Sequence, residues 1–256
     1  YLRNTEGTKK LAFEECELSN WLYEILKDEV DELVVCNPVA NKEYKKKKTD
    51  KLDARQLAKL LRGNFLVPVF HDGSKRERFR GLMSGYQQLV NENVRIKNKY
   101  KSLFRRSGIK IEGESIYKNR GLLEKIKRPD YRFIGIQLHY LLERMDESLE
   151  LYQQHIVHSK KHFKEIENLT TVPGIGAIQA AKIVSQVINP KRFPNKYKYF
   201  SYCGLVRHKK ESGQRRYGTQ KIWGNRTLKC VYKMAGHQAI KGTSALRKYY
   251  DYLRSK

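Results

Sequence analysis

The chain has few cysteines and no long apolar segment. Four cysteines occur among 256 residues and no two form a C-x-x-C pair. This scatter argues against a disulfide framework or a zinc site, so we expect reduced thiols in the core of a cytosolic protein. No run is long enough for a transmembrane helix and no targeting peptide is recognisable. The cysteines are Cys16, Cys36, Cys203 and Cys230.

Acidic residues are scarce relative to basic ones. Lys and Arg number 53 against 27 Asp and Glu, which gives a formal net charge of +26. Such an excess destabilises a compact fold by self-repulsion unless a polyanion neutralises it. Nucleic acid is the partner that this charge favours. An anionic membrane surface is a weaker alternative, because the chain lacks a long apolar segment.

An initial methionine is also absent. Tyr1 opens a polar stretch that ends at Lys10, and the first apolar run, residues 11–13, comes only after it. We therefore expect either a fragment of a longer reading frame or a processed start.

Residues 1–74 alternate between strand-like and helix-like runs. Residues 11–14, 33–36 and 65–70 are apolar and strand-like, and Ser19 or Asn20 can cap a helix after the first of them. This alternation predicts an α/β layer with a parallel sheet. Three short strands make a thin sheet, so we expect part of it to be missing or supplied at the N-terminus.

Two aspartates three residues apart, Asp50 and Asp53, open a predicted amphipathic helix just after a basic run that ends at Lys48. Residues i and i+3 share one face of a helix, so both carboxylates can point at one spot. Two hard oxygen ligands suit Mg²⁺ or Mn²⁺, and in so basic a chain such a metal indicates chemistry on phosphodiesters. The alternative is that Asp50 caps the helix and both acids favour its positive end.

Residues 75–168 have the pattern of an elongated helical block. Apolar positions recur in alternating steps of three and four, which predicts a coiled-coil seam in which Asn93 fixes the register. Ser107 and Gly108 break the first helix, so two long helices are expected to form an antiparallel hairpin or to pair with another subunit. The seam positions are Phe79, Leu82, Tyr86, Leu89, Asn93, Ile96, Tyr100 and Leu103, then Leu138, Leu142, Met145, Leu149, Tyr152, Ile156, Ser159, Phe163 and Ile166.

Residues 169–256 open with a Pro-Gly-x-Gly turn between two predicted helices. Gly174 and Gly176 match a helix–hairpin–helix, in which glycines let backbone N–H groups approach a phosphate closely. The alternative is a plain helical turn. No Gly-Lys-Ser/Thr follows the turn, and the third glycine of a dinucleotide fingerprint is missing, so neither of those nucleotide sites is present.

A stretch dense in Lys, Arg, Gly and Tyr follows, the mixture expected where a protein binds nucleic-acid backbone and bases together. Ser212 lies within it. The 17 tyrosines invite comparison with tyrosine recombinases, but no Arg–His–Arg–Tyr set is recognisable. The basic candidates for nucleic-acid contact are Lys48, Lys209, Lys210, Arg215, Arg216 and Arg226.

Taken in order, the motifs resemble the DEDD transposases of the insertion-sequence one-ten type, to which pilin-gene DNA invertases are related. The resemblance covers almost the whole chain. The motifs that carry it are Leu11-Ala12-Phe13-Glu14, Asn37-Pro38, Lys48-Thr49-Asp50-Lys51-Leu52-Asp53-Ala54, Pro173-Gly174-Ile175-Gly176, Cys203-Gly204-Leu205-Val206, Glu211-Ser212-Gly213 and Gly224-Asn225-Arg226.

The resemblance implies α/β plus α architecture. Residues 1–74 would be a truncated RuvC-like (RNase H-like) domain, residues 75–168 a coiled-coil helical insertion, and residues 169–256 a helical transposase domain with the helix–hairpin–helix. The family's acidic set is Asp, Glu, Asp, Asp. By motif, Glu14, Asp50 and Asp53 correspond to its last three members and are implied to be catalytic ligands of Mg²⁺ or Mn²⁺. The first aspartate belongs on an earlier strand that this chain does not contain, so we expect an incomplete metal site.

The resemblance also implies that Ser212 attacks a phosphodiester and forms a transient covalent link to DNA. From the residues alone, Ser212 could simply start a Ser-Gly turn. Family members use a structured noncoding RNA that pairs with donor and target DNA, whereas the invertases act without a known guide. Further implications are a homo-oligomer, a dimer or tetramer, and a place in the prokaryotic cytoplasm at the nucleoid.

We therefore expect a recombinase that cuts and rejoins the DNA of a mobile element. One alternative is a nucleic-acid-binding fragment without catalysis, which the missing first aspartate favours. Another is a simple metal nuclease, which would not need Ser212 and would release free ends.

Overall fold

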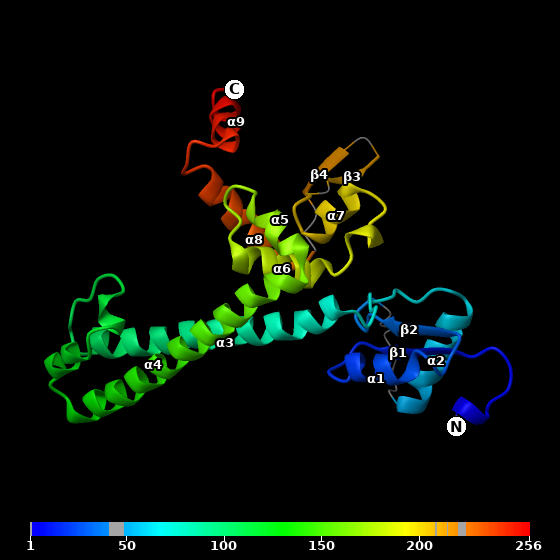
Figure 1. Cartoon of the computed structure of the whole chain (residues 1–256), viewed down its shortest axis with the longest axis horizontal. Helices are drawn as coiled ribbons and strands as arrows, with labels where there is room; N and C mark the ends of the chain where they lie inside the picture. Colours follow the sequence, from blue (N-terminus) through cyan, green and yellow to red (C-terminus); the bar gives the residue numbers. More distant parts are fainter. Residues whose placement is uncertain (1, 41–48, 208, 214, 220–223) are drawn as a thin grey trace. The chain divides into compact units, whose positions relative to one another are not determined.

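The computed structural model describes residues 2–40, 49–207, 209–213, 215–219 and 224–256. The chain divides into two compact units, Tyr1–Arg78 and Phe79–Lys256, and each is described by itself (Figure 1). Within the described ranges, no helix is long and apolar enough to cross a membrane.

A two-stranded parallel sheet organises the first unit. β1 (Lys10–Glu14) and β2 (Glu32–Cys36) pair in register along their whole length, and α1 (Ser19–Leu26) connects them. Parallel neighbours need a crossover connection, which α1 supplies. The predicted strand–helix–strand pattern is confirmed here. The short helix η1 (Leu2–Asn4) precedes β1.

The start of α1 differs from the prediction. Leu18, which provides no side-chain cap, occupies the N-cap position. Ser19 is buried in the first turn, where its hydroxyl accepts the N–H of Cys16 at 2.7 Å. The prediction that Ser19 or Asn20 caps the helix is wrong, because the serine satisfies the chain just before the helix instead.

Residues 65–70 do not form the predicted third strand. A single antiparallel bridge joins Pro68 to Cys36, and the N–H of Val69 donates to the carbonyl of Val35 at 2.7 Å. Proline has no N–H with which to continue a ladder, so the pairing stops at this bridge. The apolar run packs beside β2 without extending the parallel sheet.

Two long helices, α3 (Lys75–Arg106) and α4 (Pro129–His158), lie antiparallel in the second unit (Figure 1). The ring centroids of Tyr86 and Tyr152 are 6.1 Å apart, and 14 residues further along α3 the ring of Tyr100 lies 5.7 Å from that of His139. As predicted, α3 ends just before Ser107 and Gly108, and Gly108 has a φ of 71°. The two helices form a hairpin within the chain, and their pairing with another subunit stays a prediction.

Asn93 lies inside this hairpin with an exposed fraction of 3%. Its Nδ2 donates to Oδ1 of Asp146 on α4 at 2.6 Å, and the Nζ of Lys97 lies 3.7 Å from the same oxygen. A buried amide that finds its partner at only one alignment of two helices fixes their register. The contact gives a physical basis for the predicted role of Asn93.

The predicted seam of α4 does not continue straight to Ile166. α4 ends at His158, and the chain turns through η4 (Ser159–His162) into α5 (Lys164–Thr170). Phe163 and Ile166 therefore leave the hairpin axis and enter the core of the C-terminal helices, where both are buried. A heptad count cannot detect such a bend, because apolar spacing persists on both sides of it.

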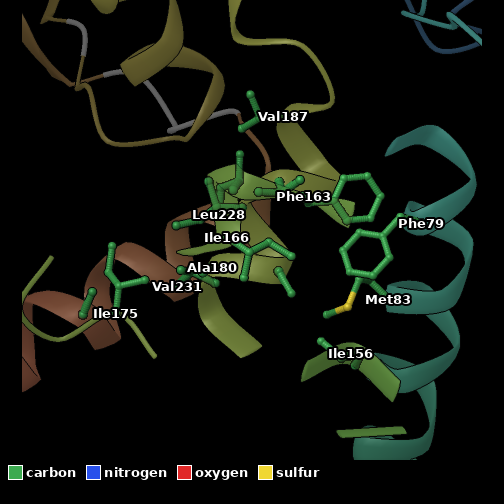
Figure 2. Packing of buried hydrophobic residues seen from close by; sticks show 14 of the residues in the cluster. Phe79, Met83, Ile156, Phe163, Ile166, Ile175, Ala180, Val187, Leu228 and Val231 are labelled. Atoms are coloured by element: carbon green, nitrogen blue, oxygen red, sulfur yellow. The ribbon is translucent and has the colours of Figure 1, made fainter. Parts of the chain in front are cut away.

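That core joins the first turns of α3 to α6 (Ala177–Val187) and α8 (Arg226–Ala239). Figure 2 shows Phe79 and Met83 from α3 facing Phe163, with ring centroids of the two phenylalanines 4.8 Å apart. Each fully buried side chain of this kind contributes roughly 1.5–3 kcal/mol. A second core closes the far end of the hairpin, around Tyr100, Phe104 and Ile126.

The remaining elements are shorter. They are η2 (Ser115–Tyr117), η3 (Arg120–Lys125), η5 (Pro190–Arg192), α7 (Lys196–Tyr202), β3 (Lys209–Ser212), β4 (Arg215–Thr219) and α9 (Ala245–Arg254). Two of the four cysteines, Cys36 and Cys203, are buried as predicted. Cys16 and Cys230 are exposed, so the prediction of core thiols is wrong for these two.

Close backbone contacts at two glycines hold the C-terminal helices together. Gly174, with a φ of 87°, lies in the turn between α5 and α6, and a Cβ there would be 2.2 Å from the carbonyl oxygen of Ala235 on α8. A Cβ on Gly224 would lie 2.5 Å from the backbone nitrogen of Gly204. Gly204 itself ends α7 in a Schellman motif, in which its N–H and that of the next residue bond back to the last turn.

The turn before α6 offers a matched test. Gly174→Ala should lower the free energy of unfolding by roughly 2–4 kcal/mol, because the methyl group meets the α8 backbone at an unfavourable φ. Gly176→Ala is the control, since Gly176 has a φ of −86° and open space at its Cβ position. Gly176 is the N-cap of α6, where alanine is less favourable than glycine, so this cost should stay within about 1 kcal/mol. Urea denaturation followed by circular dichroism measures both, and equal losses would contradict the packing argument.

Candidate active site

Three carboxylates predicted from the sequence line one cleft in the first unit. The cleft has a volume of about 530 Å³ and lies between β1 and α2 (Asp50–Arg62). Glu14 ends β1, while Asp50 and Asp53 occupy the first turn of α2. The structure thus brings together acids from two separate segments of the chain.

Apolar side chains form the rest of the cleft. Leu11 and Phe13 come from β1, and Leu57 and Leu61 come from the face of α2 that the sequence predicts to be apolar. All four are only half-buried. The packing of this face on β1 holds the first turn of α2 close to the end of the strand, which is why the acids share the cleft.

The cap of α2 is Thr49. Its Oγ1 accepts the N–H of Leu52 at 3.3 Å, and its φ and ψ are −144° and 147°. Asp50 is the first helical residue, so the alternative that Asp50 caps the helix is wrong. The other part of that alternative holds, because both acids lie in the first turn, where the helix end is positive.

The cleft acids provide hard oxygen donors, the kind that Mg²⁺ and Mn²⁺ take. Among the residues that the structure describes, however, no three His, Cys, Asp or Glu side chains come close enough to hold one ion together. Glu14, Asp50 and Asp53 therefore fit a divalent ion by donor type, but as placed they do not converge on one point.

A second group of titratable side chains, which the sequence did not predict, lies at the end of β1. The Nε2 of His71 and the Oε2 of Glu15 are 2.7 Å apart, and the Nδ1 of His71 contacts Glu77. The ring of Tyr23 lies 5.4 Å from the imidazole, whose side chain is 2% exposed. Nothing in the spacing of these residues indicates the contact, because it depends on how the segment after residue 68 passes β2.

Hydrogen bonding decides the charge state of this group. Burial lowers the pKa of His71, but hydrogen bonds and charges from Glu77 and Glu15 outweigh it and raise the pKa above its ordinary value of 6.5. Burial raises the pKa of Glu77, but hydrogen bonds from His71 and the N–H groups of Asp72 and Gly73 lower it below 4.5. These opposite shifts favour an imidazolium paired with the Glu77 carboxylate.

Glu15 directly follows Glu14, and its N–H continues the ladder to the carbonyl of Cys36 at 2.9 Å. Successive residues of a strand point to opposite faces. The contact of Glu15 with His71 therefore fixes the end of β1 from the side opposite to the cleft.

Ser212 lies at the end of an exposed antiparallel hairpin in the second unit. β3 and β4 pair with Ser212 opposite Arg215, and Gly213 follows the serine with a φ of 58°. This is the Ser-Gly turn that the residues alone suggest, and it leaves the serine side chain exposed. No hydrogen bond to its hydroxyl is present in the described part of the hairpin.

The predicted nucleic-acid contacts divide into several groups. Lys209, Lys210 and Arg215 are exposed on the serine hairpin, and Arg226 is exposed at the start of α8. Gly174 faces the backbone of α8, and the N–H of Gly176 donates to Oε1 of Gln179 at 2.9 Å. Arg216 pairs with Glu211 through the backbone, and Lys48 lies outside the described residues.

Two family models match separate parts of the chain. Residues 3–108, which include the three cleft acids, match the DEDD transposase model of the IS110 type. Residues 166–251, which include Ser212, match the transposase family IS116/IS110/IS902. No curated protein matches the chain. The chain belongs to the IS110-type transposases and is an enzyme of DNA transposition.

The histidine group beside β1 makes stability depend on pH. The raised pKa of His71 adds stability that is complete below about pH 6.5 and is lost as the pH rises through the folded-state value. The lowered pKa of Glu77 adds stability above about pH 4.5 that is lost as the pH falls further. His71→Gln should therefore lower the free energy of unfolding most between about pH 4.5 and pH 6.5 and less at pH 9. Urea denaturation at these pH values measures the difference.

His158→Gln is the matched control, because His158 is exposed on α4. It should show little change over the same range. A cost of His71→Gln that is constant or increases with pH would contradict the assignment of the imidazolium.

Proposed function

We propose that this transposase cuts and rejoins the DNA of a mobile element, with Ser212 as nucleophile and with Glu14, Asp50 and Asp53 at the reacting phosphodiester. The observation that carries the proposal is the cleft at the end of β1, which acids from two separate segments line. Both matched family ranges then have a chemical role, because one contributes the acids and the other the serine.

Glu14, Asp50 and Asp53 are the residues that would hold Mg²⁺ or Mn²⁺. When bound, such an ion stabilises negative charge that develops on a phosphodiester. The contact of Glu15 with His71 and the packing of α2 on β1 hold the two sides of the cleft in place.

Ser212 would attack the phosphorus, so that the Oγ–P bond forms as the bond from phosphorus to a deoxyribose oxygen breaks. The serine proton passes to a base and the leaving oxygen takes up a proton. Rejoining reverses these steps with a DNA hydroxyl.

A serine hydroxyl is a weak nucleophile until a base activates it. The described part of the hairpin offers the hydroxyl no such partner, so activation has to come from outside it. Arg215, which pairs with Ser212 in the hairpin, would stabilise the phosphate.

The nucleophile has a direct test. Ser212→Ala should abolish the covalent adduct with DNA while leaving DNA affinity within about twofold, because only the attacking oxygen is lost. Adducts are measured by denaturing electrophoresis with labelled DNA. Thr219→Ala, an exposed hydroxyl in the same hairpin, is the control and should retain the adduct. An adduct in Ser212→Ala would refute the assignment.

The acids have a separate test. Asp53→Asn should lower the rate of strand cleavage by about 10²-fold or more and weaken its dependence on divalent metal, because a charged donor is lost from the cleft. Asp28→Asn, which removes an exposed acid of the first unit away from the cleft, should leave the rate unchanged. Equal rates in Asp53→Asn and the parent would remove the cleft from the mechanism.

We also propose a structured guide RNA, a homo-oligomeric assembly and a place at the prokaryotic nucleoid. A charge of +26 suits two polyanions better than one. With the native locus present, one structured RNA encoded beside the gene should copurify. Random nucleic acid alone would favour a guide-free invertase or a binding fragment.

A second candidate function is nucleic-acid binding without catalysis. The separation of the three cleft acids favours it. The two candidates differ in the adduct assay, where a binding protein forms no covalent product. A simple metal nuclease would instead cut DNA, release free ends and tolerate Ser212→Ala.

A further inference from the structure

A second cleft, of about 190 Å³, lies within the second unit between α3, α6 and the start of α8. No carboxylate lines it among the residues that the structure describes, although the chain contains 27 acids. Its polar lining consists of Arg80, Ser84, Gln87, Lys182, Ser185, Gln186 and Thr227.

Lys182 is the central charge of this cleft. It is half-buried on α6, its Nζ donates to Oε1 of Gln87 at 2.6 Å, and it lies 5.7 Å from the ring centroid of Tyr86. Burial lowers the pKa of Lys182, since no carboxylate offsets it. An ammonium has three N–H donors, so a single amide oxygen leaves much of its charge uncompensated.

Another lysine of the same unit, Lys97, has the carboxylate partner that Lys182 lacks at its cleft. Lys97 is also half-buried on the hairpin, but its Nζ lies 3.7 Å from a carboxylate oxygen of Asp146. At the described lining of its cleft, Lys182 has neutral side chains and a second cation, Arg80, and outside that lining Cys230 is the group that raises its pKa. Two cations without an acid at a polar cleft form an environment that an anion stabilises.

The start of α8 is anchored at the same place. The Oδ1 of Asn225 accepts the N–H of Leu228 at 3.0 Å, and its Nδ2 donates to Oε1 of Gln186 at 2.7 Å. Because a helix N-terminus is positive, α8 adds favourable potential at the cleft, where Thr227 of its first turn is part of the lining. Two cations, a hydroxyl and a helix end from three elements thus surround one cavity.

We propose that this cleft binds a backbone phosphate of nucleic acid, with Lys182 and Arg80 as its cationic ligands and Thr227 as a neutral donor. The proposal rests on the proposed function for the source of the phosphate, since a DNA or RNA backbone supplies phosphodiesters. The cleft by itself would recognise only a phosphate group, so free inorganic phosphate should bind there as well.

The test uses the full chain and the variant Lys182→Met, which keeps the apolar stem and removes the charge. Affinity for a labelled DNA duplex is measured by fluorescence anisotropy between about 50 and 200 mM salt. Loss of one phosphate contact should make the slope of log K against log salt less steep by about 0.9 and lower affinity roughly five- to tenfold near 0.1 M. The melting temperature should not fall, because a half-buried charge without an acid partner is removed.

Lys97→Met is the matched control, because it removes a half-buried lysine that already has a carboxylate partner. Its salt slope should equal that of the parent. An unchanged slope in Lys182→Met, or a lower melting temperature without a change in slope, would show a purely structural lysine and overturn the proposal.

Inorganic phosphate separates this proposal from the proposed function. At equal ionic strength, phosphate should raise the melting temperature of the parent protein more than chloride does, and Lys182→Met should lose this difference. Failure of the unsubstituted protein to bind DNA would refute the proposed function. The melting experiment with inorganic phosphate would then test the phosphate site by itself. Equal stabilisation of parent and variant would overturn the phosphate site.

Discussion

The contact between α8 and the turn at Gly174 is the constraint on which the C-terminal core depends. Any side chain at Gly174 would collide with the carbonyl of Ala235, so backbone meets backbone there. This close approach brings α8 onto α5 and α6, where Leu228 and Val231 fill the core. A side chain at Gly174 would therefore move α8 away from the turn between α5 and α6 and loosen this core.

Local pattern predicted much of the fold, and pairing between distant segments accounts for most of what it missed. The first two strands, the apolar face of α2 and the end of α3 follow from spacing and breakers within a few residues. The failed strand at Pro68 depends on which backbone groups face β2, and the bend after His158 depends on which core the next helix joins. Neither property is encoded in a single segment.

The candidate site shows the same division. Motif order identified Glu14, Asp50 and Asp53, and the packing of α2 on β1 places all three at one cleft. The group around His71 has no motif, because its members come from the end of β1, an irregular segment and the first turn of α3. Sequence reasoning thus found the acids that line the cleft, but it missed the residues that hold the strand from the opposite side.

The segment that carries Ser212, residues 205–223, begins and ends at two glycines that are in contact, Gly204 and Gly224. This contact has a consequence for how the enzyme can diversify. Gly204 and Gly224 touch, and the N–H of Asn225 bonds to the carbonyl of Tyr202 at 2.7 Å, so the segment leaves and rejoins the core at almost one point. Loop-closure entropy rises only slowly with length. A segment with such ends can therefore be exchanged as a cassette, lengthened or shortened, while the helices beneath it keep their packing. Recombination between related elements could replace the serine hairpin without requiring the core to evolve with it.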